Sequence, residues 1–299
     1  MQGAEQITQQ LEAAGFRARF LPISAMEEIR EHYAALPRRG PDTQWLRGAI
    51  DHFRGSQPPA LDFEPKSILV IACPCVGATL ALHRKGRRIE IPIAPAYVSI
   101  SPLKNRLEEV LAGAARGYRL ENAKGFSQKL QAALSGLGQY GRNNICYVGD
   151  WGSYAWLETR YTDVPHEGAV RTRLRMEACE TCDLCRKACP TGAIGESQVI
   201  DASRCLAMRN ESRKRMPRWV PKGAHHTLSG CLRCQECCPQ NPAIDFSHTL
   251  ELDKKEAGKL LSCSRRLPKE LEEKLAAFGC EKWTMSVLKR NAKLAAKNL

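Results

Sequence analysis

A run of four cysteines in the middle of the chain constrains this protein more than any other sequence feature. The run has the spacing C-x2-C-x2-C-x3-C-P and consists of Cys179, Cys182, Cys185 and Cys189, followed by Pro190. Thiolates at this spacing wrap one four-iron cluster from a tight loop, while the cysteine before the proline points toward a second cluster. The run therefore predicts an iron–sulfur module that needs further ligands elsewhere in the chain.

Four further cysteines supply those ligands. Cys231, Cys234 and Cys238 have the spacing C-x2-C-x3-C-P, and Cys205 stands between the two runs. Cys237 competes with its neighbour Cys238, but Cys238 is the one that precedes a proline. In two-cluster bacterial ferredoxins the fourth cysteine of one run binds the cluster of the other. This rule predicts two [4Fe–4S] clusters, one on Cys179, Cys182, Cys185 and Cys238 and the other on Cys189, Cys205, Cys231 and Cys234.

A pair of zinc ribbons is the alternative, since C-x2-C repeats also bind zinc. Zinc sites usually use two separated C-x2-C pairs, with neither a third cysteine at the same spacing nor a closing Cys-Pro. The spacing therefore favours iron–sulfur clusters over zinc.

Composition and charge indicate where such a chain works. Residues 1–10 are polar and lack the apolar core of an export signal, and no apolar run is long enough to span a bilayer. Fourteen cysteines in a chain of this kind predict metal ligands in a reducing cytoplasm, with no membrane partner. The formal net charge of +13 favours a polyanionic partner or substrate, and a basic protein without such a partner is the equal alternative.

The apolar pattern predicts three segments. In residues 1–170, strand-like and helical patterns alternate, so we expect an α/β (α+β) domain. Residues 171–249 form the ferredoxin-like double-cluster module. Residues 250–299 form a basic helical extension, either a packed capping helix or, alternatively, a nucleic-acid arm. The expected strands lie at residues 67–73, 89–93, 145–148 and 156–159, the last two as neighbours, and the expected helices at residues 102–117 and 127–134.

Two further stretches stand out. Residues 135–144 contain Gly136, Gly138 and Gly141, and a glycine-rich turn after a helix admits close approach of the backbone to a ligand. The pattern is not the G-x-G-x-x-G of a dinucleotide site, so an ordinary turn is the alternative. The second stretch is basic and lies between the cysteine groups. It is either a solvated helix face or a docking surface for an acidic electron donor or nucleic acid. Its residues are Arg204, Arg209, Arg213, Lys214, Arg215, Arg218 and Lys222.

Together these features resemble the epoxyqueuosine reductase family and, more distantly, the corrinoid reductive dehalogenases. The likeness rests first on the double cysteine run with the sequence TGAI at residues 191–194 behind it. It rests next on the glycine turn GLGQYGRN at residues 136–143. The third feature is Ser153, followed by Leu157 and by the pair Thr162 and Asp163. The resemblance covers residues 115–245.

The resemblance implies a cobalamin-dependent reductase. Base-off cobalamin would lie on the α/β domain with one cluster beside it, and the clusters would pass on electrons singly from an external donor of ferredoxin or flavodoxin type. The substrate would be tRNA or another anionic molecule. The residues implied to bind the cobalamin are Gly136, Gly138, Gly141, Arg142, Asn143, Cys146 and Ser153.

Asn122 departs from the pattern of the family. Counting back 14 residues from Gly136 places Asn122 where the family carries a proposed proton-donating aspartate. An amide cannot deliver a proton as a carboxylic acid does, so we expect a substrate other than epoxyqueuosine in tRNA, or a different acid. Glu121, Tyr140 and Tyr97 are the nearest candidates for that acid.

A non-catalytic protein is the competing class. The same cysteine spacing would serve an electron-transfer protein that reduces the cobalt of a separate corrinoid protein. Retention of cobalamin distinguishes the two classes, because a pure electron relay does not need to bind it.

Overall fold

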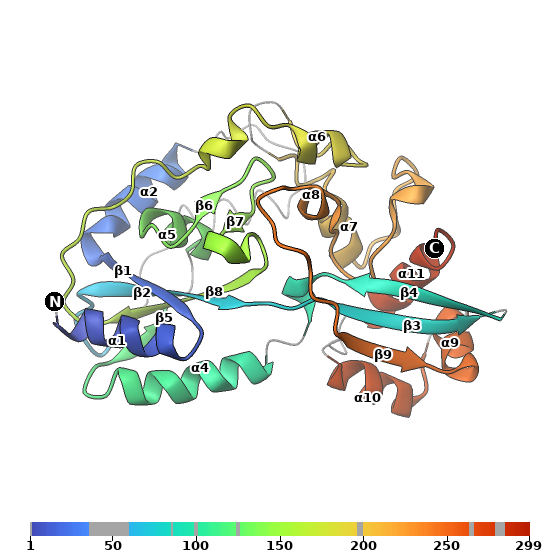
Figure 1. Ribbon diagram of the computed structural model, residues 1–299, viewed down its shortest axis with the longest axis horizontal. Coiled ribbons are helices and arrows are strands. Elements are labelled where there is room, and N and C mark those ends of the chain that lie inside the picture. Colours follow the sequence, from blue (N-terminus) through green and yellow to red (C-terminus); the bar gives the residue numbers. More distant parts are fainter. Residues whose placement is uncertain are drawn as a thin grey trace. The chain divides into compact units, whose positions relative to one another are not determined.

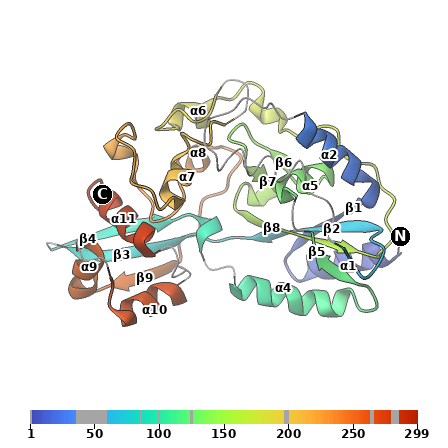
Figure 2. The same ribbon diagram turned by 180° about the vertical axis from the view of Figure 1, so that it is seen from behind.

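The computed structural model describes residues 2–35, 60–84, 86–98, 101–123, 126–195, 200–262, 266–278 and 285–299. The chain forms two compact units, each built from two separate stretches (Figure 1, Figure 2). The first unit consists of Met1–Pro74 and Ser101–Cys182, and the second of Cys75–Ile100 and Asp183–Leu299.

An antiparallel sheet of four strands organises the first unit. The strand order is β1 (Arg17–Pro22), β2 (Ser67–Pro74), β8 (Ala155–Thr162) and β5 (Leu120–Asn122). In this register Val70 of β2 lies opposite Arg19 of β1 and Thr159 of β8. The strand predicted at residues 67–73 is therefore an inner strand of the sheet.

Helices cover both faces of β2. Its odd-numbered residues Leu69, Ile71 and Cys73 pack in a core with α1 (Gln2–Ala13) and α4 (Ser101–Ala114). The alternate residues, Ile68, Val70 and Ala72, pack in a second core with α2 (Met26–Ala34) and α5 (Gln128–Leu134). A continuous apolar run is what a strand covered on both faces needs. Helices α4 and α5 confirm the two helices predicted in this part of the chain.

A small hairpin follows α5. It consists of β6 (Gln139–Tyr140) and β7 (Cys146–Tyr147), which pair antiparallel. The turn between them is closed by a hydrogen bond from Gly141 N–H to the carbonyl of Ile145 at 2.9 Å, and Asn144 adopts a φ of 60°. The prediction that residues 145–148 and 156–159 are neighbouring strands is wrong, because β7 pairs locally with β6 while β8 pairs with β2 and β5.

A three-stranded sheet organises the second unit. Its order is β4 (Arg87–Ile93), β3 (Ala78–Arg84) and β9 (His248–Leu252), with β3 antiparallel to β4 and parallel to β9. Three helices bury apolar residues in a common core with Leu80 and Leu82 of β3, namely α9 (Lys254–Leu261), α10 (Lys269–Ala277) and α11 (Met285–Ala295). The C-terminal helices are therefore packed parts of this unit, as the capping-helix alternative predicts.

Short elements lie within or next to the cysteine groups. They are η4 (Glu177–Cys179) in the first unit and α6 (Leu184–Ala188), α7 (Leu206–Glu211) and α8 (Arg233–Glu236) in the second. Helix α6 packs against α8, so the second half of the first cysteine run lies next to the second run within the second unit.

The two units divide the chain differently from the three consecutive segments that the sequence predicts. Strands β3 and β4 precede residue 170 but lie in the second unit, because β3 pairs with β9 near the C-terminal helices. The mixed α/β class is confirmed, and the domain bounds 1–170, 171–249 and 250–299 stay predictions. Among the described residues, no helix combines the length and the apolar character needed to cross a bilayer.

Candidate functional site

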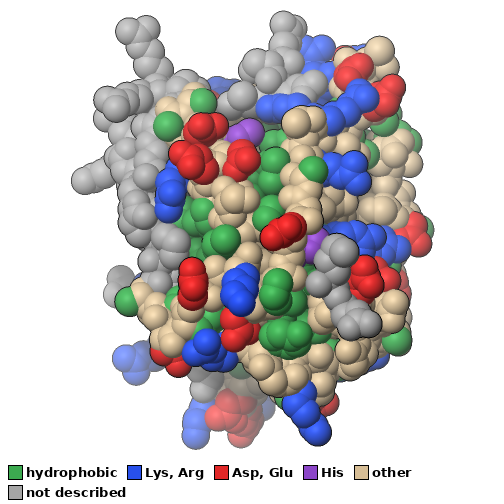
Figure 3. Space-filling model, turned by 90° about the vertical axis from the view of Figure 1, so that its left-hand side faces the viewer, with side chains coloured by type: hydrophobic (Ala, Val, Ile, Leu, Met, Phe, Trp, Pro, Cys, Tyr) green, Lys and Arg blue, Asp and Glu red, His purple; other side chains and the backbone are tan. Residues whose placement is uncertain are grey.

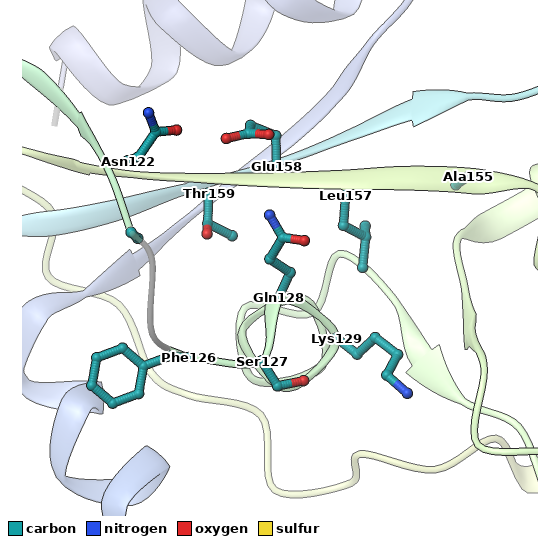
Figure 4. Close-up of a pocket in the computed structure, with 10 residues that line it drawn as sticks. Asn122, Phe126, Ser127, Gln128, Lys129, Ala155, Leu157, Glu158 and Thr159 are labelled. Atoms are coloured by element: carbon teal, nitrogen blue, oxygen red, sulfur yellow. The ribbon is translucent and has the colours of Figure 1, made fainter. Parts of the chain in front are cut away.

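A cavity of about 510 Å³ opens along β8 in the first unit (Figure 4). Its walls come from the end of β5, the start of α5 and the first half of β8. The lining residues are Asn122, Ala123, Phe126, Ser127, Gln128, Lys129, Ala155, Leu157, Glu158 and Thr159. Asn122, which the sequence singles out as a catalytic position, therefore lies in a cavity.

The cavity exists because β5 is short. Its three residues pair with the segment 160–162 of β8, and the N–H of Ala123 reaches the carbonyl of Thr159 at 3.0 Å. Strand β8 begins at Ala155, so its first residues extend past the end of β5. In an antiparallel strand, the N–H and C=O groups of every second residue point to the same edge. Those of Leu157 therefore point to the edge at which Thr159 pairs with the end of β5. This strand edge can offer N–H and C=O groups to a ligand.

One polar side chain of the cavity is buried without a partner. The hydroxyl of Thr159 has no hydrogen-bond partner in the described part of the chain. Figure 4 shows the Gln128 amide extending from α5 toward β8, between Thr159 and Leu157. A buried polar group left without a hydrogen bond costs about 1–3 kcal/mol. The hydroxyl of Thr159 is therefore a hydrogen-bonding group in the wall of the cavity that no described residue engages.

A buried ion-pair network lies on the other side of β8. Arg160 Nη1 donates to the carboxylate of Glu158 at 2.8 Å, and Arg160 Nη2 also pairs with Glu108 of α4. Glu158 and Arg160 are each 8% exposed. Asn122 lies opposite Arg160 in the register, and Figure 4 shows its amide on the same side of β8 as Glu158. The network therefore holds a carboxylate on the side of β8 to which the amide of Asn122 points (Figure 4).

Lys129 ties the cavity wall to the glycine turn. Its Nζ donates to the carbonyl of Asn144 at 2.9 Å and lies 5.8 Å from the ring centroid of Tyr140. Burial lowers the pKa of Lys129, and the nearby Cys146 opposes this shift. Figure 4 shows the ammonium group pointing away from Asn122. Lys129 therefore supports the wall of the cavity and does not face the same space as Asn122.

The other predicted acids do not line the cavity. Glu121 is exposed on β5, and Tyr140 contacts Lys129 from the hairpin. Burial raises the pKa of Tyr140. Tyr97 belongs to the second unit, where its hydroxyl donates to Glu211, and burial followed by the Glu211 charge raises the pKa of Tyr97. A raised pKa makes a phenol a weaker acid, so neither tyrosine gains strength as a proton donor.

The glycine turn is filled by atoms of the protein itself. A Cβ at Gly138 would meet Cys146 Sγ at 2.6 Å and the carbonyl of Tyr147 at 2.8 Å. A Cβ at Gly141 would meet the ring of Tyr147 at 2.5 Å. The visible reason for glycine at these positions is therefore close packing of the turn against β7, and no residue of the turn is among those that line the cavity.

The remaining residues predicted to bind cobalamin are also buried in this region. Asn143 closes the turn, since its Nδ2 donates to the hydroxyl of Tyr147 at 3.0 Å and its Oδ1 accepts from Ile145 N–H at 3.2 Å. Burial raises the pKa of Cys146 to about 12, so this thiol stays protonated at neutral pH. Ser153 is 7% exposed. The role of these residues and of Gly136, Gly138 and Gly141 in cofactor binding stays a prediction.

Arg142 holds the loop of the first two cysteines. Its Nε donates to the carbonyl of Cys182 at 2.7 Å, and its Nη2 donates to the carbonyls of Cys179 and Glu180. Its backbone N–H also lies 3.4 Å from Cys179 Sγ. Hydrogen bonds to cluster sulfurs tune reduction potential. The structure therefore places Arg142, predicted as a cobalamin residue, against the predicted cluster ligands Cys179 and Cys182.

Four predicted ligands of the second cluster lie in the second unit and influence one another. Burial raises the pKa of Cys231 to about 12, and the charges of Cys205 and Cys189 add to the rise. Burial also raises the pKa of Cys234, again with a contribution from its neighbouring thiols. Thiolates that repel one another in this way need cations between them, which suits binding to iron. Among the described residues, no group of three or more His, Cys, Asp or Glu side chains has the placement of a single-ion site.

Cys189 differs from the other thiols of this group. Burial opposes its ionisation, but hydrogen bonds from Thr191, Ala193 and Ile194 outweigh burial and lower the pKa of Cys189. One of them runs from Ala193 N–H to Cys189 Sγ at 3.3 Å. The segment TGAI that follows the first run therefore stabilises a thiolate.

Sequence reasoning missed several residues of the cavity. Gln128, Lys129, Glu158 and Thr159 line it together with Asn122. Glu158 and Arg160 are two charged residues in a strand whose residues 157–162 are all buried. Two opposite charges at alternate positions near the end of the predicted strand were the available signal, because side chains two residues apart in a strand lie on the same face and opposite charges there can pair. The other residues carry no comparable signal.

Comparison with known proteins supports the cluster assignment. Residues 178–241 match the model of a family described as a 4Fe-4S double cluster binding domain. This match confirms the prediction of two four-iron clusters in this segment, while the allocation of single cysteines stays a prediction. The epoxyqueuosine reductase of Gloeobacter violaceus is 35% identical over 123 residues, which cover 38% of this chain and 35% of that protein. The chain spans about a third of the length of the curated relatives it matches.

Solved structures extend the likeness to the whole fold. An epoxyqueuosine reductase from Bacillus subtilis aligns with a TM-score of 0.69 and 20% identity over 99% of this chain and 82% of that one. An epoxyqueuosine reductase with an epoxyqueuosine-modified tRNA-Tyr stem loop aligns with a TM-score of 0.68 and 21% identity over 99% and 81%. Reductive dehalogenases are more distant structural neighbours. The protein therefore has the fold of the epoxyqueuosine reductases, as the resemblance predicts.

Proposed function

We propose that this protein is a cobalamin- and iron–sulfur-dependent reductase of the epoxyqueuosine reductase type. The observation that carries the proposal is the cavity at the edge of β8, lined by Asn122, in a chain that also contains a double-cluster domain. Asn122 is the residue at which the resemblance locates catalysis, and its place in the wall of a cavity supports that location.

The residues of the cavity fit a corrinoid in one respect. The rim of a corrinoid carries amide groups, and the cavity offers the unpartnered hydroxyl of Thr159, the amide of Gln128 and the exposed edge of β8. These groups would hold cobalamin by hydrogen bonds. When bound, cobalamin would supply low-valent cobalt chemistry, and the two clusters would supply electrons one at a time.

Asn122 would bind and orient the substrate and would not donate a proton. A neutral amide donates and accepts hydrogen bonds but does not ionise near pH 7. Glu158 lies on the same side of β8 (Figure 4), but its carboxylate is already engaged by the guanidinium of Arg160 at 2.8 Å. A general acid typically contributes a factor of about 10²–10⁴ to the rate. We therefore propose an anionic substrate that includes tRNA, with weak turnover of epoxyqueuosine itself.

An electron relay without catalysis is the second candidate. Asn122 favours it, because a site that lacks an acid would not impair a protein that only passes electrons to a separate corrinoid protein. The two candidates share the clusters and an external donor of ferredoxin or flavodoxin type, and they differ in the binding of cobalamin.

The decisive experiment is anaerobic reconstitution followed by a binding and an activity measurement. Iron, sulfide and corrinoid are counted, and epoxyqueuosine-containing tRNA is assayed with the wild type and with Asn122→Asp. Cobalamin binding with activity appearing in the aspartate variant supports the proposal and the position of Asn122. Robust turnover by the wild type would show that Asn122 does not weaken the reaction. Clusters without any cobalamin binding would support the electron relay.

A further inference from the structure

The basic stretch of the second unit has an unusual balance of charge. Residues 204–222 contain seven Lys or Arg residues and one acidic residue, Glu211. The carboxylate of Glu211 accepts a hydrogen bond from the hydroxyl of Tyr97. Six of the seven basic residues are exposed, and Arg209 is half-buried. By contrast, the face of the first unit seen in Figure 3 carries acidic and basic side chains interspersed. We name the seven residues, together with Trp219, the basic surface.

An exposed tryptophan lies in this basic surface. Trp219 is 45% exposed, and the guanidinium carbons of Arg204 and Arg209 lie 5.3 and 5.7 Å from its ring centroid. Arginines placed over an aromatic ring gain a cation–π attraction and are held in position. Tryptophan and arginine are also the residues that most often dominate the free energy of binding at protein interfaces.

Arg290 of α11 holds the loop that carries the basic residues. Its guanidinium donates to the carbonyls of Arg209, Asn210, Ser212 and Lys214 at 3.0, 3.0, 2.6 and 2.7 Å. A guanidinium that binds four carbonyls fixes the course of the backbone between them. The charges are therefore presented by an ordered loop, which reduces the conformational entropy lost when a partner binds.

The basic surface adjoins the predicted ligands of the second cluster. Arg204 directly precedes Cys205, and its Nε donates to the carbonyl of Thr191 at 2.9 Å. The hydroxyl of Thr191 lies 3.6 Å from Cys189 Sγ. One arginine of the surface therefore contacts the segments that carry two of the four proposed ligands, so a partner bound there would come close to the cluster.

We propose that the basic surface is the docking site of an acidic one-electron carrier protein. The proposal rests on the proposed function, which requires electrons from outside. Charge complementarity would steer the carrier to the cluster edge, where each encounter moves one electron from the reduced carrier to the oxidised cluster and the oxidised carrier leaves. A nucleic acid could also bind to a surface of Arg, Lys and Trp. Closeness to the predicted cluster ligands, however, matters only for a partner that exchanges electrons with the cluster. This position favours the carrier.

The test compares two sets of charge reversals of equal size. Lys214→Glu, Arg215→Glu and Arg218→Glu alter the basic surface, while Lys254→Glu, Lys255→Glu and Lys297→Glu alter exposed lysines of the C-terminal helices and their end. Both variants and the wild type are reconstituted with clusters, and the bleaching of cluster absorbance is followed anaerobically by stopped flow. The reductant is a reduced plant-type [2Fe–2S] ferredoxin, and dithionite serves as a small reductant that needs no docking.

We expect the reversal in the basic surface to slow reduction by ferredoxin about tenfold or more at low ionic strength, with a weaker effect as salt is added. Reduction by dithionite should not change, and the control variant should behave as the wild type. Equal slowing in both variants, or no slowing in either, would overturn the docking site. Unchanged ferredoxin kinetics with weaker binding of a tRNA stem loop would assign the surface to nucleic acid. A chain that takes up no clusters would instead overturn the proposed function, and with it this inference.

Discussion

The cavity of the first unit and the thiol group of the second unit are assembled in opposite ways. The cavity joins residues 122–123 and 126–129 to residues 155 and 157–159, and it exists because β5 is shorter than β8. The thiols are supplied by short elements and the loops around them, and their spacing along the chain already determines which chemistry they can perform. The cavity offers hydrogen-bonding groups to a ligand. The thiols of the second unit instead carry negative charges, once ionised, that bound cations would compensate.

This difference tells us which kinds of change each region tolerates. Loss of a ligand thiol would remove one of the four bonds that hold a cluster, whereas loss of one hydrogen bond in the cavity would remove one of several weak contacts. We therefore expect effects to decrease from the thiols, through the packing of the glycine turn, to single polar groups of the cavity wall.

The largest effect is expected from Cys238→Ala. If Cys238 is the ligand that the crossing rule predicts, reconstituted protein should lose about four of eight irons, by the arithmetic of two four-iron clusters. Cys237→Ala is the matched control and should keep both clusters. Iron and sulfide analysis with electron paramagnetic resonance of the reduced protein measures this. The opposite result, with iron lost in the Cys237 variant alone, would move the ligand by one position.

The next effect tests whether the glycine turn is a packing element. Gly138→Ala places a methyl group against Cys146 and Tyr147 and should lower the free energy of unfolding by about 1–3 kcal/mol. Gly113→Ala in α4 is the control, because a Cβ there meets nothing within 4 Å, and it should raise stability by about 0.5–1 kcal/mol. Urea unfolding measures both. Equal stabilities with lost cobalamin binding in the Gly138 variant would instead indicate that the turn approaches a ligand.

The contrast between local and long-range features explains which parts of the fold and the site the sequence predicts. The iron–sulfur module could be identified because ligand spacing is a local property, and β2 because an apolar run needs no partner to be recognised. The pairing of β3 with β9 could not be predicted, since it joins residues about 170 positions apart and reassigns β3 and β4 to the second unit. Asn122 could be located by counting from the glycine turn. Thr159 and Gln128 could not, because a polar residue acquires meaning only when its surroundings are known.

A smaller effect is expected at the hydroxyl of Thr159. Thr159→Val removes a group that has no hydrogen-bond partner among the described residues, so the unliganded protein should be equally stable or more stable. If the hydroxyl binds cobalamin, the dissociation constant should rise by the equivalent of about 0.5–1.5 kcal/mol. Thr162→Val is the control. Its hydroxyl accepts from Val164 N–H at 3.2 Å, so this variant should lose stability without a change in cobalamin affinity. The idea fails if both variants bind cobalamin equally well.

The smallest effect concerns the pH dependence conferred by Lys129. Burial lowers the pKa of Lys129 in the folded protein below its value of about 10.4 in an unfolded chain, and Cys146 opposes this shift. Between these two pKa values the unfolded state binds more protons, so the contribution of Lys129 to stability rises as the pH rises through that window. In Lys129→Met the contribution is absent. The free energy of unfolding of the wild type, relative to this variant, should therefore be larger at pH 9.5 than at pH 7.

Cys146, with a pKa raised to about 12, and Tyr140 face the same group, and both are present in wild type and variant. Lys255→Met, at an exposed position of α9, is the matched control. A difference that stays constant or shrinks with pH would show that the ammonium of Lys129 is well solvated, and that the wall of the cavity is more open than its contacts with Asn144 and Tyr140 indicate.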